Sequence, residues 1–177
     1  MKSRLLFLLF SAAVLIGAFA LAGRLESPAA PESVTLFAAT DLHYIAPSLT
    51  DNGEAFTELV TDADGKVMLK IDPLVRAFAA QCAAERPDAV IITGDLSFNG
   101  ARESHEALAA ILAGIEAAGV PVYVMPGNHD LYSSMAARFS GDEIELAESV
   151  TASEFAGIYA EFGFDEALSR DAASLSY

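Results

Sequence analysis

The sequence predicts an α/β fold built on a parallel sheet, because three strand-like runs alternate with two helical patterns. Short, apolar, β-branched runs predict strands at residues 34–40, 88–93 and 120–125. Apolar residues at helical spacing predict helices at 71–85 and about 102–118. Such alternation implies parallel strands joined by right-handed crossovers, with helices on the faces of the sheet. Polar residues follow each strand directly, so we expect them at the carboxyl edge of the sheet, where open α/β sheets bind ligands.

The two predicted helices carry start and stop signals. Pro73 suits the first turn of the first helix, Asp72 is its expected cap, and Pro87 follows its end. The second helix is expected to stop at Gly119. The first helix also holds Cys82, the one cysteine of the chain, which excludes an intramolecular disulfide and a thiolate zinc cluster. We expect this cysteine to serve packing.

Three further segments are interpreted from local patterns. Residues 56–60 and 67–71 are predicted to form a β-hairpin around a turn at residues 62–66, where Asp-Gly stands between apolar runs. That turn resembles the opening of a calcium loop but lacks a required ligand and the closing glutamate. Residues 135–139 are predicted to form a short helical turn. Residues 151–154 have the pattern of a capping box and predict a helix after them.

Charge and length limit the possible functions. The 177 residues correspond to one domain or part of a larger one, and 10 basic against 25 acidic residues give a formal net charge of −15. This field would repel a nucleic-acid backbone, so we expect no nucleic-acid partner. An anionic substrate would need a local reversal of sign, which a bound divalent cation provides. The acidity therefore favours a metal site.

Residues 1–22 have the features of an export signal. Basic residues precede a continuous apolar run from Leu5 to Ala22 that ends in small residues, as in a secretory signal peptide cleaved after its last alanine. The run is also long enough to cross a bilayer, which takes roughly 17 residues or more, so an uncleaved membrane anchor is the alternative. In both cases a linker at 23–33 leads to an extracytoplasmic domain at 34–177, secreted or anchored to the membrane.

The polar residues that follow the strands are of the types that bind transition metals. Asp41 and His43 follow the first strand two positions apart, so in an extended segment their side chains point to one side. Asp95 follows the second strand, and Asn128 and His129 follow the third. Carboxylate and imidazole ligands suit Zn, Fe or Mn better than calcium. A carboxylate on the middle strand can bridge two cations, an arrangement that activates water and holds a phosphoryl oxygen.

These motifs resemble those of the calcineurin-like metallophosphoesterases, whose pattern runs D-x-H, G-D, G-N-H-D/E, a lone His and G-H-x-H. The chain matches the first three blocks as Asp41-Leu42-His43, Gly94-Asp95 and Gly127-Asn128-His129-Asp130. The stretches at 94–100 and 174–177 are similar to an exported bacterial branch of this family. The resemblance implies the αββα sandwich of the family, with this chain as the N-terminal portion of a truncated domain.

The resemblance also implies a dinuclear centre of two divalent metal ions, Mn, Fe or Zn. Asp41 and His43 would bind the first metal, and Asp95 would bridge both. Asn128 would bind the second. A metal-bound hydroxide would then attack the phosphorus of a phosphomonoester or phosphodiester substrate.

The same resemblance gives two residues a catalytic role. His129 would lie near the leaving-group oxygen as general acid or transition-state stabiliser, and Asp130 would orient its imidazole. A carboxylate partner is suited to this task because it selects the tautomer of a histidine and stabilises its protonated form.

The chain departs from the family pattern after the third block. It has only the histidines His43, His105 and His129, so the lone His and the G-H-x-H block are missing, and we expect weak metal binding and little activity from these residues alone. His105 is expected at the surface or in the first turn of its helix. Two alternatives stay open: a non-catalytic extracytoplasmic binding domain that keeps the fold, and a membrane-tethered structural protein whose polar residues only form turns, with Asn128 in a type I′ turn. The oligomeric state is left open.

Overall fold

The computed structural model describes residues 33–61, 67–169 and 171. Within them, three parallel strands form one sheet in the order β1-β2-β3, with β1 at Leu36–Thr40, β2 at Ala89–Thr93 and β3 at Val122–Met125. Each strand begins one or two residues later than predicted. The alternation in the sequence thus correctly indicated a parallel sheet.

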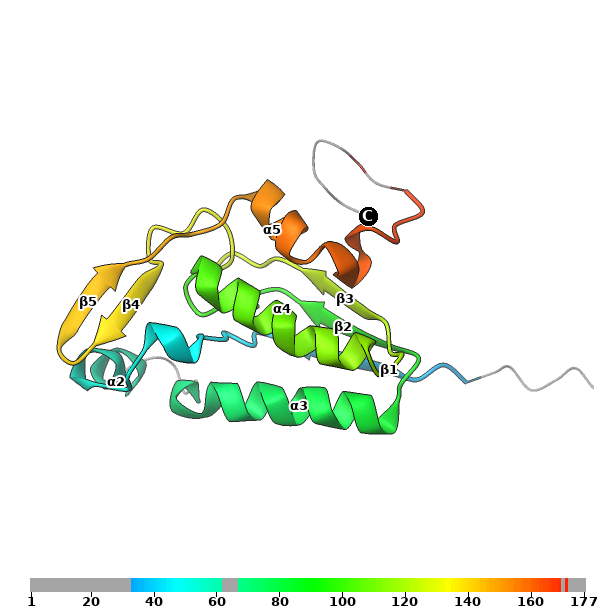
Figure 1. Ribbon diagram of the computed structural model, residues 1–177, viewed down its shortest axis with the longest axis horizontal. Coiled ribbons are helices and arrows are strands. Elements are labelled where there is room, and N and C mark those ends of the chain that lie inside the picture. Colours follow the sequence, from blue (N-terminus) through cyan, green and yellow to red (C-terminus); the bar gives the residue numbers. More distant parts are fainter. Residues whose placement is uncertain (1–32, 62–66, 170, 172–177) are drawn as a thin grey trace, which may run out of the picture. The chain divides into compact units, whose positions relative to one another are not determined.

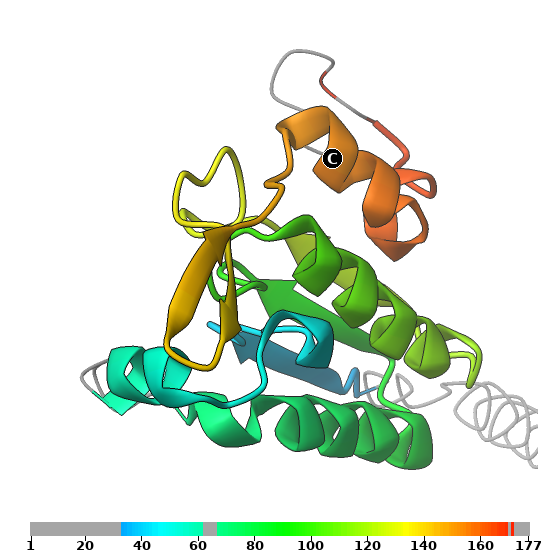
Figure 2. The same ribbon diagram turned by 60° about the vertical axis from the view of Figure 1, so that its left-hand side comes forward.

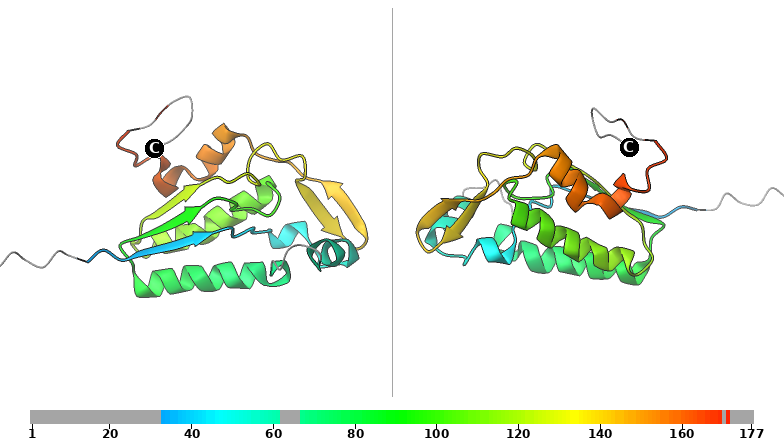
Figure 3. Two further views of the ribbon diagram at one scale, coloured as in Figure 1. Left: turned by 180° about the vertical axis from the view of Figure 1, so that it is seen from behind. Right: turned by 45° about the horizontal axis from the view of Figure 1, so that its top comes forward.

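Two helices connect the strands and lie on the same face of the sheet (Figure 1). Helix α3 spans the predicted residues Ile71–Glu85, and helix α4 spans Arg102–Glu116. Two successive right-handed crossovers between neighbouring strands place both helices on one side. The left panel of Figure 3 shows the opposite face, over which no helix of the described residues lies. The described part of the chain therefore supplies the parallel sheet and one helical layer of the expected sandwich.

The core lies between the sheet and the two helices. Alternate residues of β2 and β3 point toward the helices and are buried, as the period-2 pattern of a strand requires. They belong to one apolar cluster with residues of both helices, namely Val90, Ile92, Val122, Val124, Leu108, Leu112, Ile115, Val75 and Cys82. Cys82 is fully buried, which confirms its packing role, and burial raises the pKa of its thiol.

The predicted cap of α3 is wrong. A 3₁₀ turn, η2 at Met68–Lys70, runs directly into the helix, so the N-cap is Lys70 and no side chain caps the helix there. Asp72 instead accepts hydrogen bonds from the Tyr44 hydroxyl at 2.9 Å and from Arg76 Nε at 3.0 and 3.1 Å. This carboxylate ties the helix to the loop that follows β1.

The predicted hairpin at 56–60 and 67–71 is also wrong. Residues Glu54–Thr61 form helix α2, and residues 68–71 belong to η2 and the start of α3. The buried side chains of α2 are Phe56 and Val60, which are four residues apart and so share one helical face. The intervening turn at 62–66 lies outside the described residues.

A hairpin occurs where a helical turn was predicted. Strand β4 at Ala137–Ser140 pairs antiparallel with β5 at Glu143–Leu146, and the two-residue loop between them contains Gly141 at φ 60°. Two-residue hairpin loops favour such left-handed glycines, and burial alternates along β4. Figure 2 shows this hairpin beside α2, where Ala55 N–H donates to the Gly141 carbonyl oxygen at 2.9 Å.

The capping box predicted at Thr151 is confirmed and begins helix α5 at Ala152–Ile158. The Glu154 N–H donates to the Thr151 hydroxyl, while the Glu154 carboxylate accepts from the Thr151 N–H at 2.8 Å. These bonds to Thr151 lower the pKa of Glu154 to about 2. A π-helical turn, η3 at Ala160–Phe164, follows and contains Gly163 at φ 100°.

Two further features complete the described chain. The 3₁₀ turn η1 at Pro47–Leu49 lies in the connection after β1. No helix within residues 33–61 and 67–169 is long and apolar enough to cross a membrane. The predicted signal or anchor at 1–22, and all but the last residue of the predicted linker at 23–33, lie outside the described residues.

Candidate metal centre

The segments that follow β1 and β2 run side by side beyond the end of the sheet. Asp41 N–H donates to the Gly94 carbonyl oxygen at 3.2 Å, and His43 N–H donates to the Asp95 carbonyl oxygen at 2.8 Å. Parallel pairing therefore continues past the last strand residues. It brings the first two motif blocks of the sequence together at the carboxyl edge of the sheet.

Three of the four predicted metal ligands meet at this edge. One ligand atom from each of Asp41, His43 and Asp95 lies within 4.8 Å of the others. His43 Nε2 is 3.7 Å from Asp41 Oδ1 and 3.8 Å from Asp95 Oδ2. The side chains of His43 and Asp95 are 6% and 14% exposed, whereas that of Asp41 is 59% exposed. His43 and Asp95 are thus mostly buried, whereas Asp41 leaves the cluster open to solvent on one side.

The backbone of the cluster differs from the expected extended segment. Asp41, His43 and Asp95 have φ angles of 54°, 43° and 45°, in the left-handed region that residues with a β-carbon rarely occupy. Such conformations persist only where surrounding contacts impose them, and they concentrate at functional sites. A left-handed turn, and not extended alternation, therefore makes Asp41 and His43 converge.

The chemistry of this donor set fits a divalent transition metal. Two carboxylates held this close repel each other unless a cation lies between them. Two carboxylate oxygens with one imidazole nitrogen suit Mn, Fe or Zn. Asp41, His43 and Asp95 could therefore hold a metal ion.

Gly127 allows the third block to approach the cluster closely. A β-carbon at this position would overlap the carboxylate and the backbone nitrogen of Asp95. Gly94, at φ 76°, lies against Gly127 on the neighbouring strand end, since a β-carbon on Gly94 would be 3.4 Å from the Gly127 Cα. The two glycines thus permit the close backbone approach between the loops after β2 and β3.

His129 reaches the cluster from a turn after β3. The turn at 127–130 is closed by a hydrogen bond of 3.4 Å between its first and last residues. A type I′ turn would require positive φ at both Asn128 and His129, and neither has it. His129 N–H donates to Asp95 Oδ1 at 3.0 Å, and its ring stands edge-on to that of His43, with centroids 5.2 Å apart. Asn128 lies in the same turn with its side chain exposed.

Asp130, expected to orient the His129 imidazole, is buried between the loops after β2 and β3. Its carboxylate is fully buried and accepts hydrogen bonds from the backbone N–H groups of Leu96, Ser97 and Gly127 at 3.0, 2.8 and 2.7 Å. It accepts a fourth from the Ser97 hydroxyl at 2.8 Å. Both oxygens are therefore engaged by the loops after β2 and β3, and these contacts of Asp130 join the two loops.

His105, expected at the surface or in the first turn of its helix, lies in the first turn of α4 and is fully buried. Its Nε2 lies 3.1 Å from the Asp130 carbonyl oxygen, and its Nδ1 lies 3.1 Å from the Tyr159 hydroxyl. Burial lowers the pKa of His105 and raises that of Tyr159 well above its usual value. The prediction overlooked a signal: His105 shares the helix face of Leu108 and Leu112, at spacings of three and seven.

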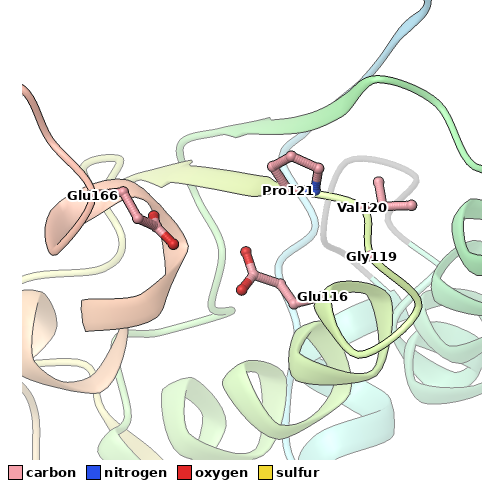
Figure 4. Close-up of a pocket in the computed structure, with 5 residues that line it drawn as sticks. All are labelled: Glu116, Gly119, Val120, Pro121 and Glu166. Carbon is pink, nitrogen blue, oxygen red and sulfur yellow. The ribbon is translucent and has the colours of Figure 1, made fainter.

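A cavity of about 230 Å³ lies at the opposite end of β3 (Figure 4). Glu116 and Glu166 line it together with Gly119, Val120 and Pro121. Burial raises the pKa of Glu116, whose carboxylate accepts a hydrogen bond from Val122 N–H. With two carboxylates and no basic side chain in its lining, this cavity does not suit an anionic ligand.

Comparison with known proteins assigns the family. Residues 35–167 match the family described as calcineurin-like phosphoesterase. A protein of Rhodopseudomonas palustris (strain ATCC BAA-98 / CGA009), named "Probable cyclic nucleotide phosphodiesterase", is 39% identical over 83 residues, which cover 45% of this chain and 29% of that protein. The chain thus spans less than a third of the length of this relative. The family match covers well over half of the chain, including the sheet and all three motif-bearing loops, so the chain belongs to the calcineurin-like phosphoesterase family.

Proposed function

We propose that this protein is a metal-dependent hydrolase of phosphoester bonds. One observation carries the proposal: Asp41, His43 and Asp95 converge at the carboxyl edge of the sheet, with His129 directly beside them. This edge is where open α/β sheets place their ligands. Membership in a phosphoesterase family supports the reaction class.

The metal ligands follow from the same cluster. Asp41 and His43 would bind the first of two divalent cations, Asp95 would bind both, and Asn128 would bind the second. Bound cations of this kind act as Lewis acids toward a phosphoryl oxygen and lower the pKa of water. They would also reverse the sign of the local field in a chain whose formal charge is −15, and so admit an anionic ester.

His129 would handle the proton of the leaving group. Its backbone is fixed on Asp95, while its side chain is only partly buried and so remains accessible from the open side of the cluster. A protonated imidazole in that place can donate to the leaving-group oxygen as the ester bond breaks. The substrate is proposed as a phosphodiester first and a phosphomonoester second, because the R. palustris relative carries the name of a phosphodiesterase.

We propose an extracytoplasmic location for this reaction. The support is the apolar run from Leu5 to Ala22 that follows basic residues at the N-terminus. If the run is cleaved the protein is released, and if it is retained the domain is tethered to the membrane.

The proposed function is tested by metal binding and hydrolysis in the full-length protein. The chelator-treated protein is titrated with Mn²⁺ by calorimetry and assayed with bis-p-nitrophenyl phosphate and p-nitrophenyl phosphate. Asp95→Asn should lower both Mn²⁺ affinity and kcat by more than about 100-fold, since it removes the proposed shared ligand. The matched control Asp142→Asn makes the same chemical change at an exposed position and should leave both within about twofold.

Other outcomes identify the alternatives. Tight Mn²⁺ binding without hydrolysis of either ester would favour a binding domain that keeps the fold. Absence of both binding and hydrolysis would refute the proposal and leave the polar residues as turn residues.

A further inference from the structure

Buried residues with no role in the proposed reaction contact the segment His129–Asp130 from two sides. Gly100, at φ 75°, passes directly over it: a β-carbon there would lie 2.8 Å from the His129 carbonyl oxygen and 3.3 Å from that of Asp130. The Ser97 hydroxyl accepts from Gly100 N–H at 3.0 Å and donates to Asp130 at 2.8 Å. The loop after β2 therefore holds this segment from one side.

His105 holds the same segment from the other side. A carbonyl oxygen only accepts, so His105 Nε2–H must donate to the Asp130 carbonyl. Burial lowers the pKa of His105, which keeps the ring neutral, and its Nδ1 then accepts from the Tyr159 hydroxyl. Reversal of this tautomer would turn a nitrogen lone pair toward the Asp130 carbonyl. Tyr159 thus stabilises the one tautomer that can hold Asp130.

We propose that His105 and Tyr159 are positioning residues for His129. Asp130 is held at its carboxylate by the two loops and at its carbonyl by His105, so the residue before it, His129, has a fixed place. The hydrogen bonds run from Tyr159, the C-cap of α5, through His105 on α4 to the edge of the metal cluster. This inference rests on the proposed function, because the proton that His129 donates is the reason its place matters.

Within the described residues, the hydrogen bonds of the His105 ring go to the Tyr159 hydroxyl and to the Asp130 carbonyl oxygen. The rings of Phe155 and Tyr159 stand edge-on to it, with centroids at 5.5 and 5.8 Å. The Asp130 carboxylate is farther from Nε2, at 3.9 Å, than the Asp130 carbonyl oxygen at 3.1 Å. Loss of the Tyr159 hydroxyl would therefore act on the Asp130 carbonyl through the His105 ring.

The first test compares Tyr159→Phe with Tyr44→Phe in the full-length, Mn²⁺-loaded protein. Both tyrosines are fully buried, and each hydroxyl donates one hydrogen bond, but that of Tyr44 goes to Asp72 on α3. The substrates are bis-p-nitrophenyl phosphate and diphenyl phosphate, whose poorer leaving group depends more on protonation. Tyr159→Phe should lower kcat for diphenyl phosphate about tenfold more than for the nitrophenyl ester, with KM within about twofold. Tyr44→Phe should lower both by the same factor.

The second test needs no activity. Long-range ¹H–¹⁵N correlation spectra of the metal-free protein should show His105 as the Nε2–H tautomer. The His129 ring signals should move in Tyr159→Phe and in His105→Leu. They should stay in place in Tyr44→Phe and largely return in His105→Gln, whose amide can donate to the Asp130 carbonyl in place of Nε2–H.

The outcomes separate the two proposals. Equal loss of kcat for both esters in Tyr159→Phe, or unmoved His129 signals in that variant, would overturn the positioning role. Failure of the wild-type protein to hydrolyse either diester would instead overturn the proposed function, while the spectra still decide whether His105 and Tyr159 place His129.

Discussion

Replacing Asp130 by asparagine tests whether its carboxylate joins the two active-site loops. One oxygen accepts from Ser97 N–H and the Ser97 hydroxyl, and the other accepts from Leu96 N–H and Gly127 N–H. An asparagine NH₂ group must face one of these pairs. The less costly choice is the Ser97 side, because the hydroxyl can rotate and accept from the NH₂ group while only one buried backbone N–H loses its acceptor. That loss costs about 1–3 kcal/mol, and the two bonds that remain to the amide oxygen, from Leu96 N–H and Gly127 N–H, lose the charge of the acceptor.

The expected result is a destabilised protein whose metal ligands are intact. For a chain of this length, a loss of about 2 kcal/mol lowers the melting temperature by roughly 4–8 °C, which thermal unfolding followed by circular dichroism can measure. Asp142→Asn makes the same chemical change at an exposed position and should shift the melting temperature by less than about 2 °C. If Asp130→Asn melts at the wild-type temperature but no longer hydrolyses the ester, its carboxylate does not join the two loops. That result would favour the role of orienting the His129 imidazole.

Three other perturbations have defined outcomes. Gly127→Ala should lower the Mn²⁺ affinity measured by calorimetric titration by about tenfold or more, because its β-carbon would overlap Asp95. The control Gly114→Ala has nothing within 4 Å of the added carbon and should leave this affinity unchanged. Burial lowers the pKa of His105 from its usual 6.5, so on acidification this histidine takes up its proton first in the unfolded chain. The free energy of unfolding should therefore be at its full value above pH 6.5 and fall as the pH decreases toward the folded pKa. Urea titrations of His105→Gln should show a weaker dependence on pH in this range. In a bacterial host, N-terminal sequencing of the exported protein should find cleavage after Ala22, or else recover the intact N-terminus in the membrane fraction; full-length protein in the soluble cytoplasmic fraction would contradict both forms of the export proposal.

Local patterns were enough to predict the sheet and its helices. Strand period, helix period and stop signals act over a few residues, so β1 to β3, α3 and α4 were placed within one or two residues. The exceptions were short segments in which two periods compete. In α2, Phe56 and Val60 fit a helix as well as a strand, and in β4 the left-handed Gly141 that turns the chain is two residues beyond the segment predicted as a helical turn.

The motif blocks predicted candidate metal ligands by residue type and by their place after each strand. The conformation that makes them converge was a tertiary result. Asp41, His43 and Asp95 adopt left-handed backbones in two loops whose pairing continues past the sheet. A local sequence pattern contains no information on pairing between two loops that are far apart in the chain.

The sequence alone determined the fold class, the family motifs and which side chains could bind a metal, because each depends on local order along the chain. Only the tertiary structure decided what Asp130 and His105 do. The partners of Asp130 on the loop after β2 are 33 and 34 positions away, and Tyr159 is 54 positions from His105. Both residues are fully buried, and a buried polar group must find its partners wherever folding brings them. Burial and long-range hydrogen bonding therefore set the contacts of these two residues.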